Sequence, residues 1–259
     1  MSETFSNVDA SSDAAGAIAW QERIDAWPQI RAYKQRSYEW CGEQEPRLDV
    51  GAGPGTDAVA LGAFATDLSL AMCGAAAARG IAVCRADAQA LPFADASFGA
   101  VRADRVLQHV SDPERALAEM VRVTALGGCV VVSDPDQSTL EIEVRGAPAA
   151  LVAKVITTRR EIGYRHGTIA GRMTELFAAA GLTQITTEGF PLVLTDPDDA
   201  FGLPGWPRYW SNRFDADEVA AWEQSVKIAR EGGFAFRCSY VVTAGVRPQA
   251  SSDGAGGTR

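Results

Sequence analysis

The chain has 259 residues, 47% of them hydrophobic, and a formal net charge of −9. A chain of this length and composition can bury a large core, as one domain with insertions. The negative charge disfavours nucleic acid or an anionic membrane as the main partner, because both attract faces rich in Lys and Arg.

The five cysteines are odd in number and widely scattered, which indicates buried thiols in a reducing compartment and not a disulfide framework. No His and Cys cluster has the spacing of a zinc site, so no metal is expected. The N-terminus lacks the basic and apolar regions of a signal peptide, and no apolar run reaches membrane-spanning length. We therefore expect a soluble cytoplasmic protein.

Helix and strand signals alternate between two tails rich in Ser, Gly and Asp, residues 1–14 and 248–259, which we expect to be disordered. Helical segments are expected over 17–42, and a partly helical insertion over 137–167. Seven strands are expected at residues 47–50, 63–67, 81–88, 97–104, 128–134, 183–194 and 234–246. Further helices are expected at 57–62, 68–80, 112–124, 168–181 and 215–230. This alternation is typical of an α/β protein with a doubly wound, mostly parallel sheet.

A glycine-rich turn follows the first expected strand, in the segment LDVGAGPGTDA at 48–58. Glycine is favoured where φ is positive or where a ligand approaches the backbone closely. In the dinucleotide fingerprint GxGxxG the third glycine would be residue 56, but Thr56 stands there and the glycine is Gly55. Asp49, two residues before Gly51, would repel a pyrophosphate and attract a ligand that carries an ammonium and a sulfonium.

The segment resembles motif I of the class I S-adenosylmethionine-dependent methyltransferases, and three further motifs follow in order. They are ATDLSLAM, RADAQALPFADASFGAV and RVLQHVSDPERALAEMVRVTALGGCVVVSDPD, the last similar to the ubiquinone/menaquinone and natural-product methyltransferase group. The resemblance covers about residues 45–137 and implies a Rossmann-like methyltransferase fold with seven strands. It implies one domain over 15–247, made of an N-terminal helical cap (15–44), a cofactor-binding half (45–134) and two substrate-cap insertions (135–167 and 195–232).

The resemblance also implies S-adenosylmethionine as the cofactor and assigns residues to it. Asp67 would bind both ribose hydroxyls, unless it only caps the following helix, and Asp87 and the Ala88 amide would meet adenine. Asp49 would bind the methionine ammonium, or else only amides of the glycine loop. The full expected set is Asp49, Gly51, Ala52, Gly53, Gly55, Asp67, Leu68, Asp87, Ala88, Arg105 and Gln108. Two features depart from the family: Asp67 follows Gly51 closely, which requires a very short helix between them, and Gly99 stands where the family has Asp.

The fourth strand ends where this fold places the reacting group. Asp104, His109 and His166 are the candidate catalytic bases, although His109 could simply pack at the helix entry and His166 could be a solvated loop residue. Aromatic residues before and after the core predict an apolar pocket for a flat or greasy molecule. We assign to this pocket Trp20, Tyr33, Tyr38, Trp206 and Trp210, some of which could instead join the cap to the core. Lys34 and Arg36 are expected on a solvated helix face, although the resemblance also allows them to face the cofactor carboxylate, as in some relatives.

Together these features predict methyl transfer from S-adenosylmethionine to O or C of a small, largely apolar or aromatic metabolite, in secondary metabolism. One alternative is a protein of the same fold that binds the cofactor and catalyses a cyclisation or rearrangement. A dinucleotide-dependent oxidoreductase is disfavoured by Thr56, and a cofactor sensor without activity by the aromatic cap. The expected partner is a small-molecule substrate, with no nucleic acid and no membrane, and a homodimer is left open.

Overall fold

The structure, a computed structural model, describes residue 9 and residues 13–249. Most of the two tails for which we predict disorder therefore lies outside the described residues. The first tail is predicted slightly too long, because α2 (Ala14–Asp25) begins at its last residue and is capped by the Asp13 side chain, which accepts from Gly16 N. None of the helices within the described residues has the length and apolarity needed to cross a bilayer.

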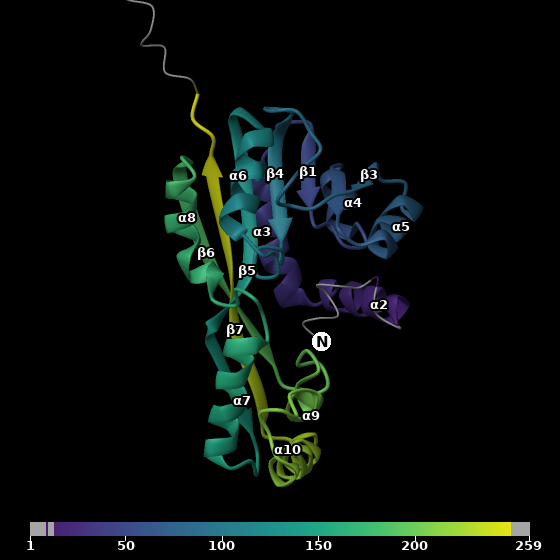
Figure 1. Cartoon of the computed structure of the whole chain (residues 1–259), viewed down its shortest axis with the longest axis vertical. Helices are drawn as coiled ribbons and strands as arrows, with labels where there is room; N and C mark the ends of the chain where they lie inside the picture. Colours follow the sequence, from purple (N-terminus) through teal and green to yellow (C-terminus); the bar gives the residue numbers. More distant parts are fainter. Residues whose placement is uncertain (1–8, 10–12, 250–259) are drawn as a thin grey trace, which may run out of the picture.

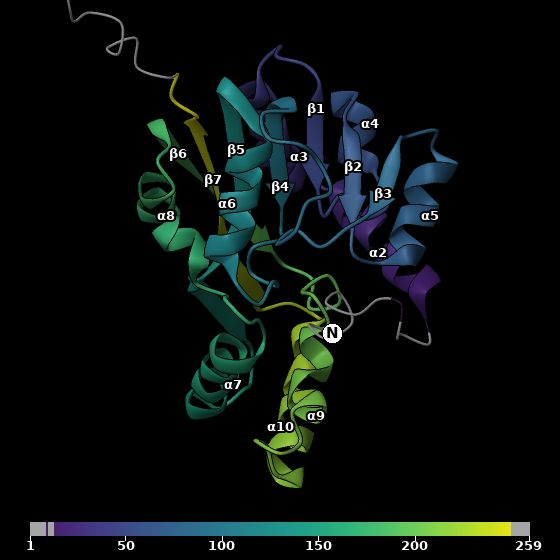
Figure 2. The same cartoon turned by 45° about the horizontal axis from the view of Figure 1, so that its top comes forward.

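One seven-stranded sheet forms the centre of the molecule, with the order β3-β2-β1-β4-β5-β7-β6 (Figures 1 and 2). Neighbouring strands from β3 to β5 are parallel, and β7 is antiparallel to both β5 and β6. The strands are β1 (Arg47–Val50), β2 (Phe64–Asp67), β3 (Val83–Arg85), β4 (Phe98–Asp104), β5 (Thr124–Val144), β6 (Thr183–Leu194) and β7 (Phe234–Val246). The prediction of a doubly wound, mostly parallel seven-stranded sheet is confirmed.

Helices cover both faces of this sheet, as Figure 2 shows for α3 on one side and α6 and α8 on the other. The helix α6 illustrates why the sequence folds this way: Asp112 accepts from Arg115 N at 2.9 Å, and Pro113 occupies the first turn. Its apolar residues recur at helical spacing and are buried against β4 and β5. The other helices are α3 (Pro28–Cys41), α4 (Thr56–Leu61), α5 (Leu70–Ala78), α7 (Ala149–Ile162), α8 (Met173–Ala179), α9 (Trp206–Tyr209) and α10 (Ala216–Ala229).

The fifth strand is much longer than predicted. It continues past residue 134 to Val144, so the insertion that we expect at 135–167 begins as a strand and only then forms α7. The signal for the extension is the segment LEIEV (140–144), in which Leu140, Ile142 and Val144 are buried and the two glutamates are exposed. The long ends of β5, β6 and β7 carry a second lobe with α7, α9 and α10, drawn at the bottom of Figure 1.

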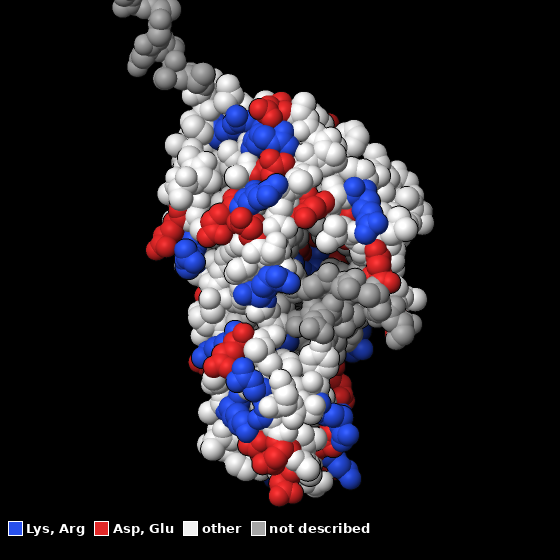
Figure 3. Space-filling model, viewed as in Figure 1, with Lys and Arg blue, Asp and Glu red and all other residues white. Residues whose placement is uncertain are grey.

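Charged side chains of both signs are interspersed over the face of the molecule drawn in Figure 3, outside the atoms drawn in grey. The blue Lys and Arg groups there lie beside red Asp and Glu groups and form no continuous basic area.

Gly55 ends the glycine loop at the start of α4, with φ +83°, where a Cβ atom would lie 2.7 Å from Ile81 Cδ1 and 2.9 Å from Ala76 Cβ. At the other end of α4, Gly62 has φ +61° but nothing within 4 Å of its Cβ position. We therefore expect Gly55→Ala to lower the free energy of unfolding by about 2–4 kcal/mol and Gly62→Ala by only about 1 kcal/mol. Urea unfolding measures both. Equal losses would contradict the steric part of this argument.

Candidate cofactor and substrate site

A pocket of about 540 Å³ lies at the carboxyl ends of β1, β2 and β4, the edge where open α/β sheets bind ligands. Residues from both lobes line it. Of the predicted residues, the pocket is lined by Trp20, Gly51, Gly53, Asp67, Leu68, Asp87, Ala88, Asp104, Arg105, Gln108 and His109. It is also lined by Asp9, Pro135, Tyr164, Phe201 and Tyr240, of which Phe201 is one of the aromatic residues that follow the sixth expected strand.

Asp67 ends β2 and is held by the loops on either side of it. Its two carboxylate oxygens accept from Gly53 N at 2.9 Å and from Ser69 N at 2.8 Å. Burial raises the pKa of Asp67, although the two amides oppose this effect. The N-cap of α5 is Ser69, whose hydroxyl accepts from Met72 N at 3.2 Å. Ser69 therefore caps α5, and Asp67, at the end of β2, holds the glycine loop through its bond to Gly53 N.

The short helix that the spacing of Asp67 requires is present, since α4 has only 6 residues. Asp9, which the sequence does not single out, lies at the start of α5, just beyond the end of β2. Its carboxylate accepts from Ser69 Oγ at 2.6 Å and from the backbone amides of Leu70 and Ala71 at 2.8 and 3.1 Å. These bonds lower the pKa of Asp9 to about 2. Two carboxylates, Asp67 and Asp9, therefore accept from backbone amides at the start of α5, beside the pocket.

Asp87 follows β3 and belongs to a loop that is fixed to the start of α6. Its carboxylate accepts from Gln89 N at 2.9 Å and from Gln89 Nε2 at 3.0 Å. The side-chain oxygen of Gln89, Oε1, in turn accepts from Ser111 Oγ at 2.7 Å and from Asp112 N at 2.9 Å. Asp67 and Asp87 therefore face the same pocket from the ends of neighbouring strands.

The segment after β4 supplies the candidate catalytic residues. Arg105 has φ +58°, and its side chain turns away to pair with Asp25 at 2.7 Å. His109 is half-buried, and loss of solvent around the ring lowers its pKa to about 4, with the charges of Arg159 and Arg105 acting in the same direction. His109 is therefore a neutral imidazole at pH 7 and can accept a proton.

Asp104 lines the pocket but is surrounded by groups that favour its ionised form. Its carboxylate accepts from Ser133 Oγ at 2.8 Å and from Tyr33 Oη at 3.2 Å. Burial alone would raise the pKa of Asp104, but the charges of Arg105, Lys34 and Arg102 outweigh burial and hold it below its usual range. This environment makes Asp104 a weak proton acceptor.

Asp49, Tyr38 and Lys34 lie outside the pocket in a buried ionic network beneath the glycine loop. Arg102 Nη1 lies 3.1 Å from Asp49 Oδ1 and 3.0 Å from Asp57 Oδ2. Tyr38 donates to Asp57 at 2.6 Å. The prediction of a solvated face is wrong for Lys34, which is 3% exposed and lies 2.9 Å from Asp57.

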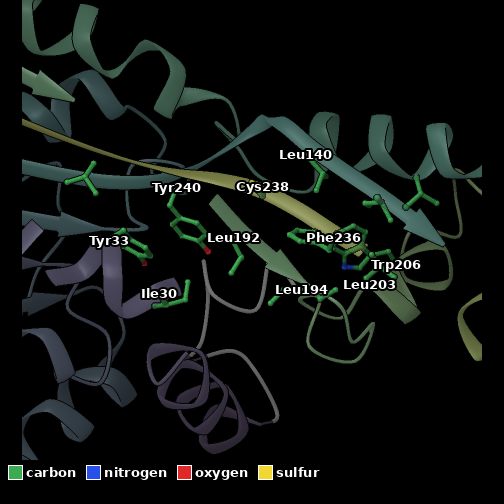
Figure 4. Packing of buried hydrophobic residues seen from close by; sticks show 14 of the residues in the cluster. Ile30, Tyr33, Leu140, Leu192, Leu194, Leu203, Trp206, Phe236, Cys238 and Tyr240 are labelled. Carbon is green, nitrogen blue, oxygen red and sulfur yellow. The ribbon is translucent and has the colours of Figure 1, made fainter. Parts of the chain in front are cut away.

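Several other predicted residues are also kept from the pocket. Tyr33 stacks on Tyr240 with centroids 4.6 Å apart, so Tyr240 lines the pocket and Tyr33 lies behind it. Trp206 and Trp210 pack on each other in the core of the second lobe, where Figure 4 shows Trp206 against Phe236. They do so because the late insertion folds on its own extension of the sheet, away from the glycine loop. Outside the pocket lining there are also Ala52, Gly55 and His166.

The strand order, the glycine loop after β1 and the two acids after β2 and β3 define a nucleoside-binding α/β protein. Residues 48–132 match the methyltransferase domain family. The chain is 45% identical over 94 residues to a demethylmenaquinone methyltransferase of Renibacterium salmoninarum, covering 34% of this chain and 40% of that protein. The chain therefore carries a methyltransferase domain of the class I S-adenosylmethionine-dependent type, whose cofactor is S-adenosylmethionine.

Two further similarities extend beyond the methyltransferase domain. An uncharacterized protein encoded in transposon Tn4556 of Streptomyces fradiae is 31% identical over 207 residues, which cover 74% of this chain and 59% of that protein. The chain thus spans only about half the length of the relatives that it matches. The solved structure of the [4+2]-cyclase SpnF aligns with a TM-score of 0.57 at 22% identity and covers 85% of this chain and 82% of its own. At this identity the likeness concerns the fold.

Proposed function

We propose that this chain binds S-adenosylmethionine in the pocket at the ends of β1, β2 and β4 and transfers its methyl group to a small molecule. The acceptor atom is an oxygen or carbon of a largely apolar or aromatic metabolite, made by a cytoplasmic pathway of secondary metabolism. The observation that carries the proposal is that Asp67, Asp87 and the loop glycines Gly51 and Gly53 line one pocket of about 540 Å³.

The residues present fit this cofactor. Gly51 and Gly53 leave the loop without side chains on the pocket side, and their φ values of +66° and +55° suit glycine. Asp67 would accept from the ribose hydroxyls, and Asp87 and the Ala88 amide would meet the adenine ring. When bound, S-adenosylmethionine would supply a methyl group attached to a sulfonium, and the neutral thioether that remains is a good leaving group.

The remaining lining residues would hold the acceptor and exclude water. Tyr240, Phe201 and Tyr164 bring three aromatic rings to the part of the pocket beyond β4. Alignment of two reactants in such a site can lower a barrier by about 7–11 kcal/mol. His109, which is neutral at pH 7, would remove the proton of an oxygen nucleophile, a contribution of roughly 10²–10⁴-fold.

Calorimetric titration with S-adenosylmethionine tests the first half of the proposal, and absence of binding would refute it. Incubation of the loaded enzyme with aromatic and polyketide-like metabolites and a methyl-labelled cofactor tests the second half, read by mass spectrometry. Label in the product supports methyl transfer. The fold of SpnF supports a second candidate, a cyclisation or rearrangement without methyl transfer. It would appear as a product of unchanged mass with no consumption of cofactor.

The desolvated His109 imidazole gives a prediction that needs no substrate. The chain has only two histidines, so NMR titration can follow each ring, and His109→Asn identifies one of them. We expect His109 to titrate near pH 4. Because the folded-state pKa lies below the unfolded value of about 6.5, His109 lowers the stability as the pH falls from about 6.5 to about 4, by about 2–3 kcal/mol in total. A His109 ring that titrates near 6.5 would contradict its desolvation.

A further inference from the structure

Arg159 is a buried cation for which the described chain supplies no carboxylate. It lies in the last turn of α7 and is 3% exposed. Two other Lys or Arg residues are similarly buried, Lys34 and Arg102, and each has a carboxylate oxygen within 3.1 Å. No Asp or Glu of the described residues comes within the 4.0 Å of an ion pair to Arg159, and its Nε atom is buried without a hydrogen-bond partner.

Aromatic rings surround the guanidinium of Arg159. Its central carbon lies 4.4 Å from the ring centroid of Tyr164 and 4.2 Å from that of Trp206. Its Nη2 donates to Tyr164 Oη at 2.6 Å. Gly163 leaves room for this side chain, because a Cβ atom there would lie 2.7 Å from Arg159 Cδ. The rings stabilise the cation through their faces, but they accept no hydrogen bond from Nε.

Arg159 lies directly behind the wall of the pocket. Tyr164, which it contacts, lines the pocket and packs edge-on against His109 with centroids 5.4 Å apart. At the same end, Gln108 is 2% exposed and its Oε1 atom has no hydrogen-bond partner. This end of the pocket therefore combines an aromatic wall with a positive charge and polar atoms that the chain leaves unmatched.

We propose that the Tyr164 hydroxyl, which Arg159 holds from behind the wall, binds an anionic group of the methyl acceptor, a carboxylate or a phosphate, and that the charge of Arg159 favours this group. A buried charge is unfavourable unless it is paired, and the Tyr164 hydroxyl, which accepts from Arg159, keeps its own proton free to donate to an anion in the pocket. The inference rests on the proposed function and narrows its substrate class: the acceptor is an aromatic or apolar molecule that carries an acid at the end held by α7. Arg159 is then a specificity residue and takes no part in the transfer itself.

Calorimetry on the full chain saturated with S-adenosylhomocysteine tests this inference with three probes of similar shape: benzoate, phenyl phosphate and neutral benzamide. We expect benzoate or phenyl phosphate to bind about tenfold or more tightly than benzamide, and the better of the two identifies the acid. Arg159→Gln should remove this preference, and Arg159→Lys should keep part of it. Arg165→Gln is the matched control, because Arg165 is an exposed arginine that lines the pocket, and it should keep the preference.

Two outcomes would overturn the inference. One is a wild-type chain that shows no preference for either anion over benzamide, including one that binds neither anion. The other is a preference that survives in Arg159→Gln, whatever Arg165→Gln does. Binding of S-adenosylhomocysteine, measured first, shows that each variant is folded. Its absence in the wild type would refute the proposed function separately, and if Arg159→Gln fails to fold, the wild-type comparison and Arg159→Lys still decide.

Discussion

Replacement of Asp67 by alanine is expected to weaken binding of S-adenosylmethionine by about 10–100-fold. The change removes a carboxylate that faces the pocket, and each hydrogen bond to a charged group contributes about 1.5–3 kcal/mol. It also frees the amides of Gly53 and Ser69, which the carboxylate holds at 2.9 and 2.8 Å. Isothermal titration calorimetry measures the affinity of both proteins.

Two further variants separate ribose binding from loop support. Asp67→Asn keeps a carbonyl oxygen as acceptor for one amide but loses the charge, so its affinity should lie between those of the wild type and the alanine variant. Asp95→Asn is the control, because Asp95 is an exposed acid that pairs with Arg122 and lies outside the pocket lining. It should leave the affinity unchanged. A folded Asp67→Ala protein with wild-type affinity would remove Asp67 from the ribose site.

Most of the sheet could be predicted from the sequence because its strands are short apolar runs or alternating segments between turn residues. The predicted bounds of β1, β6 and β7 agree with those in the structure. The second half of β5 could not be assigned as easily, since LEIEV follows a long buried run without a turn. The period of the pattern changes there from a strand buried on both faces to one buried on a single face.

In the candidate site, some positions follow from chain order alone and others depend on contacts between distant segments. Asp67 ends β2 and Asp87 follows the neighbouring strand β3, and parallel strands bring their carboxyl ends to one edge, so chain order alone places them together. Lys34 differs, because its partners Asp25 and Asp57 come from helices on either side of it in the sequence. A lysine on a helix is usually solvated, and only the assembled fold supplies the acids that permit its burial.

Trp206 and Trp210 show why an aromatic cluster in the sequence does not locate a substrate pocket. Apolar rings are buried both in a substrate pocket and in the protein core, and the hydrophobic effect is not directional, so it does not distinguish the two. The structure places both in the core of the second lobe, where Trp206 Nε1 donates to Phe201 O at 3.0 Å. Phe201, in contrast, reaches the pocket from the same insertion.

Replacement of Arg102 by glutamine is expected to have the largest effect on stability. Arg102 is 1% exposed, and burial alone would lower its pKa, but the acids around it outweigh burial and keep it charged. Its Nη1 lies between Asp49 and Asp57, and its Nε donates to Ser37 Oγ at 2.8 Å. Removal of one partner leaves uncompensated charge in the core, which costs about 3–5 kcal/mol. Chemical unfolding of the purified protein measures this loss.

Two comparisons identify the cause of that loss. Arg230→Gln removes an arginine that pairs with Asp198 at 2.7 Å on the surface, so it should cost less than about 1 kcal/mol. Asp49→Asn introduced into Arg102→Gln removes one of the acids that lost its partner, so it should restore part of the stability. The effects of substitutions within one ionic network are not additive. An Arg102→Gln protein as stable as Arg230→Gln would show that the network contributes little.

The same network should also set the affinity for the cofactor, because it lies directly beneath the glycine loop. Asp57 is the second residue of α4, the helix that follows the glycine loop. Asp104 ends β4 and lines the pocket. A ligand that binds only the folded state stabilises it in proportion to the logarithm of its concentration over its dissociation constant. Saturating S-adenosylmethionine should therefore raise the unfolding midpoint of Arg230→Gln as much as that of the wild type, and that of Arg102→Gln by less. Equal increases in all three proteins would mean that Arg102 stabilises the fold without positioning the loop.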